Sequence, residues 1–186
     1  MKDLDIHAFK AVLNFVRGLA LTTMGLLMGA SLTANAASKT KLSVFTTGTP
    51  AVGLPCAPST PSAVLMGGGT DVSQAYTWMI NKANCGATPA HLGNVVVLRS
   101  TGNGDYDKYI YKLGPVAAVQ TLVVPDRAAA NDPTLNSYIQ NAAVIWIAGG
   151  DQSVYYAQWK GTLLENLVQQ QIRNYNSHLA ARVRAS

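Results

Sequence analysis

Charged side chains are scarce in this chain. Asp, Glu, Lys and Arg make up 12% of its 186 residues and apolar residues 48%, a composition typical of one globular domain and not of a disordered chain. The formal charge of +5 lies mostly near the C-terminus, and residues 37–172 carry only +1, from eight basic and seven acidic side chains. Because no basic patch interleaved with aromatic residues occurs there, no nucleic-acid partner is expected.

Cysteine and histidine are also rare. The cysteines are Cys56 and Cys85, and His91 is the one histidine between residues 37 and 172. This spacing fits no metal site, and neither a metal nor another cofactor is expected. His91 follows Pro89 in a loop, where a surface or capping role is favoured over that of a general base. In an oxidising compartment the two cysteines could form a disulfide, but two free thiols remain the alternative, since sequence does not give their distance.

An uncharged and largely apolar run lies near the N-terminus. Residues 18–32 form such a run, with basic residues before it and small residues after it: Lys2, Lys10, Arg17, Ala34, Asn35 and Ala36. This pattern predicts a signal peptide over residues 1–36 and export to the periplasm or the extracellular space. A membrane anchor is the alternative, but the run is short for a bilayer, so no stable anchor is expected.

The rest of the chain predicts a three-layer α/β domain with a mostly parallel sheet flanked by helices. Residues 37–61 are rich in Thr, Pro and Gly and are interpreted as an arm or loop, with a short strand possible at 42–45. Short apolar runs then alternate with segments of helical spacing, as in buried parallel sheets. The predicted strands are 63–66, 95–98, 121–124 and 143–148, and the predicted helices are 72–82, 106–113 and 133–141. Asp132, before Pro133, is the expected N-cap of the last of these helices.

Two glycine-rich segments follow predicted strands. Gly67-Gly68-Gly69-Thr70-Asp71 lacks the spacing of a phosphate-binding loop, so a tight turn that needs glycine at positive φ is favoured over a nucleotide site. Ala148-Gly149-Gly150-Asp151-Gln152 stands at the carboxyl end of a predicted central strand, where ligands of such sheets bind. Its glycines could direct a backbone N–H at a reacting oxygen, as in an oxyanion hole. A glycine turn followed by an N-cap at Asp151 explains the spacing equally well.

Several of these segments together resemble one family. Gly149-Gly150-Asp151-Gln152-Ser153 and the residues after it closely resemble the cyanophycinase-like branch of the S51 serine peptidases, whose fold is similar to that of class I glutamine amidotransferases. The match spans about residues 62–170. The other matching residues are Gly67, Gly68, Gly69, Asp71, Ser100, Thr101, Gly102, Tyr106, Tyr109, Asp126, Arg127, Ala128, Ala129, Tyr155, Tyr156, Trp159, Lys160, Gly161 and Thr162.

The resemblance implies an exported serine peptidase that hydrolyses small or isopeptide-linked peptides, such as cyanophycin or a dipeptide. It implies that Gly149 and Gly150 line the oxyanion hole and that Gln152, with Asp151, contacts the substrate; a homodimer is one possible assembly. The family's nucleophile lies in a Gly-Gly-Thr-Ser-Ala-Gly segment soon after a helix that here begins near Thr162. Because this chain lacks that segment, residues 62–172 are interpreted as an incomplete peptidase-like domain, with no catalytic residue assigned and no hydrolysis expected.

The last residues, 173–186, are interpreted as an out-of-frame tail. When the codons of residues 179–185 are re-read from the third base of Leu179, they take the forms NGC, NGC, NCG, NGT, NCG and NGC, which permit Gly-Gly-Thr-Ser-Ala-Gly in that order. The hypothesis is a frameshift between about Gln171 and Leu179. Ser177 and His178 fall in this tail and are not interpreted as a catalytic pair.

Two other functions remain open. The chain could be a non-catalytic α/β module that binds a ligand through its two glycine-rich segments, or a gene fragment whose unpaired apolar sheet edge promotes aggregation. Tyr155, Tyr156 and Trp159 could form a binding platform, but core packing is favoured for most of them.

Overall fold

The computed structural model describes residues 41–54, 62–67, 69–84, 92–174 and 178–182. The chain divides into a unit Met1–Ala37 and a unit Ser38–Ser186, and all described residues belong to the second. The predicted signal peptide, Cys56, Cys85, His91 and Gly68 lie outside the described residues. No helix in the described ranges is long and apolar enough to cross a membrane.

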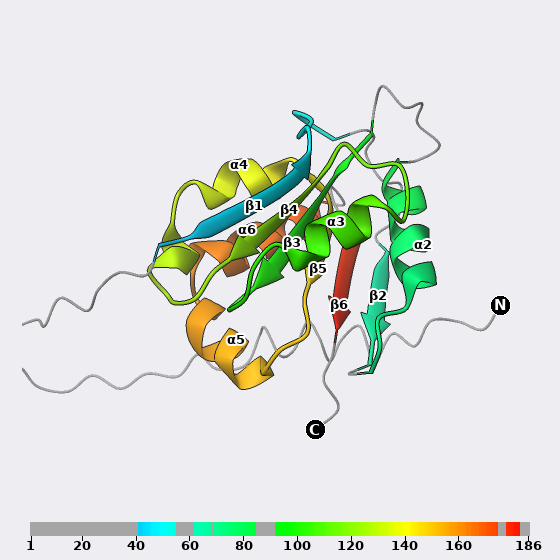
Figure 1. Ribbon diagram of the computed structural model, residues 1–186. Helices are drawn as coiled ribbons and strands as arrows, with labels where there is room; N and C mark the ends of the chain where they lie inside the picture. Colours follow the sequence, from blue (N-terminus) through cyan, green and yellow to red (C-terminus); the bar gives the residue numbers. More distant parts are fainter. Residues whose placement is uncertain (1–40, 55–61, 68, 85–91, 175–177, 183–186) are drawn as a thin grey trace, which may run out of the picture. The chain divides into compact units, whose positions relative to one another are not determined.

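Six strands form one sheet in the order β1-β4-β3-β5-β6-β2 (Figure 1). All neighbours are parallel except β1 and β4. The mostly parallel sheet with helices on both faces confirms the predicted fold class. The strands are β1 (Ser43–Gly48), β2 (Ala63–Met66), β3 (Asn94–Arg99), β4 (Ala118–Val123), β5 (Ala142–Ile147) and β6 (His178–Arg182).

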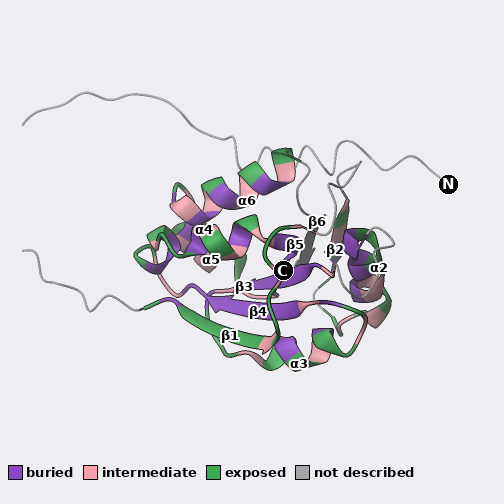
Figure 2. Ribbon diagram, turned by 90° about the horizontal axis from the view of Figure 1, so that it is seen from above, coloured by how far each residue is buried: buried purple, intermediate pink, exposed green. Residues whose placement is uncertain are grey.

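Helices flank this sheet on both faces (Figure 2). One core cluster joins one side of the sheet to α2 (Ser73–Asn84) and α3 (Asp105–Tyr111). The other cluster joins the opposite side to α4 (Leu135–Gln140), α5 (Gln152–Trp159) and α6 (Leu163–Arg173), with the 3₁₀ turn Ala129–Asn131. Alternate residues of β3 enter different clusters, Val95 and Val97 one, Val96 and Leu98 the other. A parallel strand covered on both faces is therefore apolar at successive positions.

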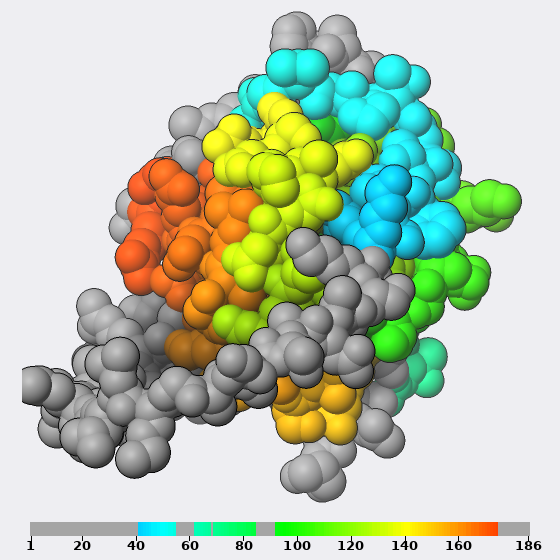
Figure 3. Space-filling view, turned by 90° about the vertical axis from the view of Figure 1, so that its left-hand side faces the viewer, coloured from blue at the N-terminus to red at the C-terminus, as the bar shows by residue number. Residues whose placement is uncertain are grey.

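Helix α6 packs against α4, and β1 lies on the other side of α4 (Figure 3). Gln171 of α6 is buried, and its Nε2 donates to the carbonyl oxygens of Ile139 at 2.8 Å and Gln140 at 3.1 Å. These carbonyls lie at the end of α4, where the last carbonyl oxygens of a helix have no N–H donor within the helix. One side chain of α6 therefore satisfies the end of α4.

The predicted elements are found, with shifts at their ends. β2 has the predicted bounds, and the helix expected near Thr162 is α6, with Thr162 as its N-cap residue. The N-cap prediction for Asp132 is wrong in position, because α4 begins at Leu135 with Thr134 as its N-cap residue. The Asp132 carboxylate instead closes the preceding turn, accepting from the Thr134 N–H at 2.9 Å.

One strand is longer and shifted relative to the possible strand at 42–45, and another lies where no strand is expected. Residues 43–48, within the expected arm, form β1 along β4. Residues 178–182, within the expected tail, form β6 between β5 and β2, and Arg173, which was assigned to the tail, ends α6. Both segments join the sheet because β4 and β5 offer backbone N–H and C=O groups with which a neighbouring strand can pair.

Candidate functional site

Both glycine-rich segments lie at the carboxyl edge of the parallel sheet. Gly67 follows Met66, the last residue of β2, and Gly149 follows shortly after Ile147, the last residue of β5. Strand β6 lies between them, with Met66 paired to Arg182 and Ile147 to Ala181. The end of β6 is thus flanked by the two segments, at the position where ligands of open α/β sheets bind (Figure 1).

The Gly149–Gly150 turn is shaped by a close contact with Tyr155. A Cβ on Gly150 would lie 2.6 Å from the Tyr155 hydroxyl oxygen and 2.9 Å from its Cζ. The hydroxyl donates to the Ala148 carbonyl at 3.0 Å. Glycine is therefore required at 150 by close approach, since any other side chain would displace the tyrosine.

Tyr155 is held in its protonated form at this turn. Burial raises the pKa of Tyr155, while a hydrogen bond from Ser100 and the charge of Arg99 oppose the rise. Its ring stacks on Trp159 at 4.4 Å between centroids. Tyr155 and Trp159 therefore pack as expected, whereas Tyr156 is 45% exposed.

The predicted substrate-contacting residues lie at the start of α5. Asp151 is the N-cap residue, and its Oδ1 accepts from the Ser153 N–H at 2.8 Å and the Ser153 hydroxyl at 2.6 Å. The capping alternative is thus present in the structure. Gln152 is the first residue of α5 and is exposed. The positive end of the α5 dipole therefore adjoins Gly150, which favours a partial negative charge there.

The glycine-rich segment that follows β2 is not closely packed at Gly67 and Gly69. A Cβ on Gly67 or Gly69 would meet nothing within 4 Å, and neither residue has positive φ. The interpretation of this segment as a turn that needs positive φ is therefore wrong for these two glycines, because the backbone here takes ordinary angles in open space.

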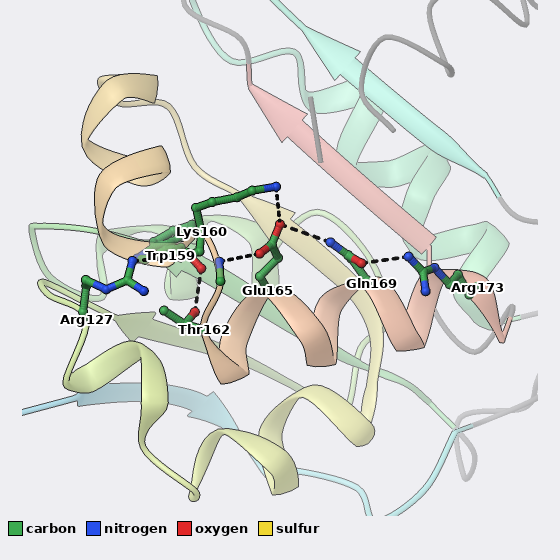
Figure 4. A network of polar contacts seen from close by, with 8 residues as sticks. Arg127, Trp159, Lys160, Thr162, Glu165, Gln169 and Arg173 are labelled. Atoms are coloured by element: carbon green, nitrogen blue, oxygen red, sulfur yellow. Dashed lines mark hydrogen bonds and ion pairs between the residues drawn. The ribbon is translucent and has the colours of Figure 1, made fainter. Parts of the chain in front are cut away.

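The carboxyl end of α5 is anchored from the segment after β4 (Figure 4). Arg127 Nη1 donates to the carbonyl oxygens of Ala157 at 3.1 Å and Lys160 at 2.8 Å. Trp159 Nε1 donates to the Val124 carbonyl at 3.0 Å. Three hydrogen bonds from two donor nitrogens thus hold the end of the helix that begins at the Gly149–Gly150 turn.

The corner between α5 and α6 is closed by a second set of contacts (Figure 4). Gly161 has φ +68, and its N–H donates to Glu165 Oε2 at 2.6 Å. Glu165 Oε1 lies 3.3 Å from Lys160 Nζ, and the Thr162 hydroxyl donates to the Trp159 carbonyl at 2.6 Å. The segments around Arg127 and Trp159, which both belong to the family resemblance, therefore meet at the corner between α5 and α6 and hold α5 in position.

The loop after β3 forms the other side of the edge. The Arg99 guanidinium lies 5.2 Å from the centre of the Tyr106 ring, and its Nη1 donates to the Asn103 carbonyl at 2.9 Å. Gly102 has φ +105, and a Cβ there would collide with the same guanidinium. The loop is thus wrapped around Arg99, which explains its glycine.

The structure positions no histidine at this edge within its described part. His178 begins β6 and pairs with Val144, whereas Arg182 ends the strand. Four residues of strand separate His178 from the carboxyl edge, about 13 Å at roughly 3.3 Å per residue. Ser177, its neighbour, lies outside the described residues. Among the described residues, the edge therefore supplies backbone donors and a tyrosine, but no hydroxyl or thiol with a histidine beside it.

A likeness to a known structure agrees with this architecture. The chain is similar to a solved structure described as a peptidase from an acI-B1 Actinobacterium, with a TM-score of 0.52 and 18% identity, over 68% of this chain and 55% of that one. The chain has a peptidase-like α/β fold. It spans about half the length of that peptidase. No family model matches the chain, and no curated protein matches it.

Proposed function

We propose that this chain is a form of an exported, cyanophycinase-like serine peptidase of the S51 type that lacks its nucleophile. The observation that carries the proposal is the Gly149–Gly150 turn at the carboxyl end of β5, directly beside the end of β6. The peptidase-like fold supports the same class of function.

In this proposal the backbone of Gly149 and Gly150 binds the carbonyl oxygen of a peptide, and Gln152 with Asp151 contacts the rest of the substrate. Tyr155 keeps the turn in place through the Ala148 carbonyl. Backbone donors that are fixed before the reaction stabilise charge on the carbonyl oxygen. Polarisation alone does not cleave a peptide, because no group in the described site attacks the carbonyl carbon.

The position of β6 supports the frameshift hypothesis. The offset reading places Gly-Gly-Thr-Ser-Ala-Gly over residues 179–185, with its serine at about residue 183. Strand β6 ends at Arg182, between the ends of β5 and β2. If the offset residues paired with β5 and β2 as β6 does, a serine at the next position would follow a strand at the carboxyl edge, as a nucleophile on a sharp turn requires.

The test is hydrolysis of cyanophycin and of a set of dipeptides by the purified full chain. We expect no product above that of buffer. A second protein, extended in the offset frame, should release product, and replacement of its restored serine by alanine should abolish release. Hydrolysis by the unmodified chain would contradict the proposal. Absence of hydrolysis in both proteins, with a ligand-induced rise in thermal stability of the unmodified chain, would favour a binding module.

A further inference from the structure

Asp107 is a carboxylate buried under α3, away from the polar residues of the glycine turn. Its side chain is 2% exposed, although it belongs to the first turn of a seven-residue helix at the surface of the domain. The Thr121 hydroxyl of β4, itself fully buried, donates to Asp107 Oδ1 at 2.5 Å. A buried carboxylate with one neutral donor is poorly compensated for the loss of water.

Few charges face this carboxylate. Strands β1 and β4 pack against α3 and contain no ionisable residue. Arg99 of β3 is the one cation that acts on it appreciably, and Asp105 and Lys108 lie elsewhere on α3. Burial raises the pKa of Asp107 from 3.8 to about 6, and the Thr121 bond and Arg99 only partly oppose the rise.

Helix α3 is attached to the loop that borders the candidate site. Asp107 Oδ2 lies near Gly104, where a Cβ would be 3.1 Å away. Gly104 is the N-cap residue of α3 and ends the loop that begins at Ser100. Ser100 lies near enough to Tyr155 to oppose the rise in the pKa of that tyrosine. The loop 100–104 therefore connects α3 to one side of the site.

We propose that Asp107 and Thr121 form a pH-sensitive latch that fastens α3 and the loop 100–104 to β4. When Asp107 is neutral, the closed arrangement keeps the Thr121 bond with no buried charge. When Asp107 ionises, opening of α3 hydrates the carboxylate and so becomes more favourable. This inference concerns the closed and open forms of the loop and does not depend on the proposed peptidase function.

The direction of the effect follows from the raised pKa. The closed form binds the Asp107 proton more tightly than the open form does, so the closing contribution is fully present below pH 3.8 and is lost as the pH rises through about 6. A difference of about two pKa units changes the equilibrium between closed and open forms by roughly a hundredfold.

The test is amide hydrogen exchange by NMR on the full chain at about pH 4 and about pH 8, each rate corrected for intrinsic exchange. Protection of Tyr109 and Ile110 in α3 should fall by roughly a hundredfold between these values. Asp107→Asn should remove the fall, whereas Asp105→Asn, which alters an exposed carboxylate on the same helix, should retain it. Thr121→Val, which removes the donor, should enlarge it.

Two results would overturn the latch. One is a fall of wild-type size in Asp107→Asn, because another group would then be responsible. The other is equal protection of Ile110 and of Val97 in β3 at both pH values, because α3 would then open only when the whole domain unfolds. Neither result bears on hydrolysis, so failure of the latch and failure of the proposed function are distinguishable.

Discussion

Replacement of Asn94 by alanine should destabilise the domain more than any single exposed substitution. Asn94 begins β3 and is 1% exposed. Its Oδ1 accepts from the Ala51 N–H at 2.9 Å, and its Nδ2 donates to the carbonyls of Ala51 at 2.7 Å and Asn141 at 3.1 Å. The side chain thus joins the segment after β1 to the segment between α4 and β5.

The magnitude follows from these three bonds. Each contributes about 1 kcal/mol net, and water can partly replace the asparagine at the half-buried partners, so the loss should be about 2–3 kcal/mol. Urea unfolding followed by tryptophan fluorescence measures it, with an unchanged m-value as the sign that only stability has changed. Asn94 lies at the amino edge of the sheet, so the candidate site is unaffected.

Two variants complete this experiment. Asn166→Ala removes an exposed asparagine of α6 and should be neutral or slightly stabilising, since alanine favours helix by several tenths of a kcal/mol. Asn94→Asp keeps the acceptor but places a carboxylate against two carbonyl oxygens, and its destabilisation should grow as the pH rises. A loss below about 1 kcal/mol in Asn94→Ala would refute the assignment of these bonds as the link between the segments.

Three further substitutions test the site and its support. Gly150→Ala should lower the free energy of unfolding by about 1–3 kcal/mol through collision with Tyr155, and the loss should be smaller in a Tyr155→Phe background, as a double-mutant cycle in urea would show. Arg127→Ala should lower the free energy of unfolding by about 1 kcal/mol, a modest value because the side chain is exposed. Arg127→Lys should recover only part of this loss in thermal melts, since the lysine side chain is one bond shorter and its ammonium does not reach the position of Nη1, which makes both bonds. Gln171→Leu should lower the free energy of unfolding by about 1–3 kcal/mol because two carbonyls of α4 lose their donor. Gln170→Leu, at an exposed position of the same helix, should change this free energy by less than about 0.5 kcal/mol. Equal losses in the two variants would contradict the assignment of Gln171 as the donor to the end of α4.

The core strands were predictable because burial on both faces leaves a clear sequence pattern. β2, β3 and β5 were predicted to within two residues at each end, since each is a continuous apolar run. β4 begins three residues earlier than predicted, because Gln120 is buried in it despite its amide. β1 was expected at most as a short strand, since its Ser, Thr and Gly residues are exposed at the edge of the sheet.

The location of the Gly149–Gly150 turn was predictable from the sequence, but the contacts that hold the turn and α5 in place were not. A glycine pair after a buried strand predicts the carboxyl edge of a sheet. The contact of Gly150 with Tyr155 and the bonds of Arg127 to α5 join residues that only the tertiary structure brings together. β6 was missed because residues 178–182 were interpreted as out of frame, and a five-residue strand with histidine and arginine at its ends carries a weak pattern.

The most direct test of the proposed function is the nucleotide sequence that encodes the chain from Leu163 to beyond Ser186. The proposal predicts that an offset frame reads Gly-Gly-Thr-Ser-Ala-Gly across the codons of residues 179–185 and then stays open. If the offset frame does not spell this segment, β6 is a genuine strand of the encoded protein, the frameshift hypothesis is wrong, and a ligand-binding role becomes the leading explanation of the site.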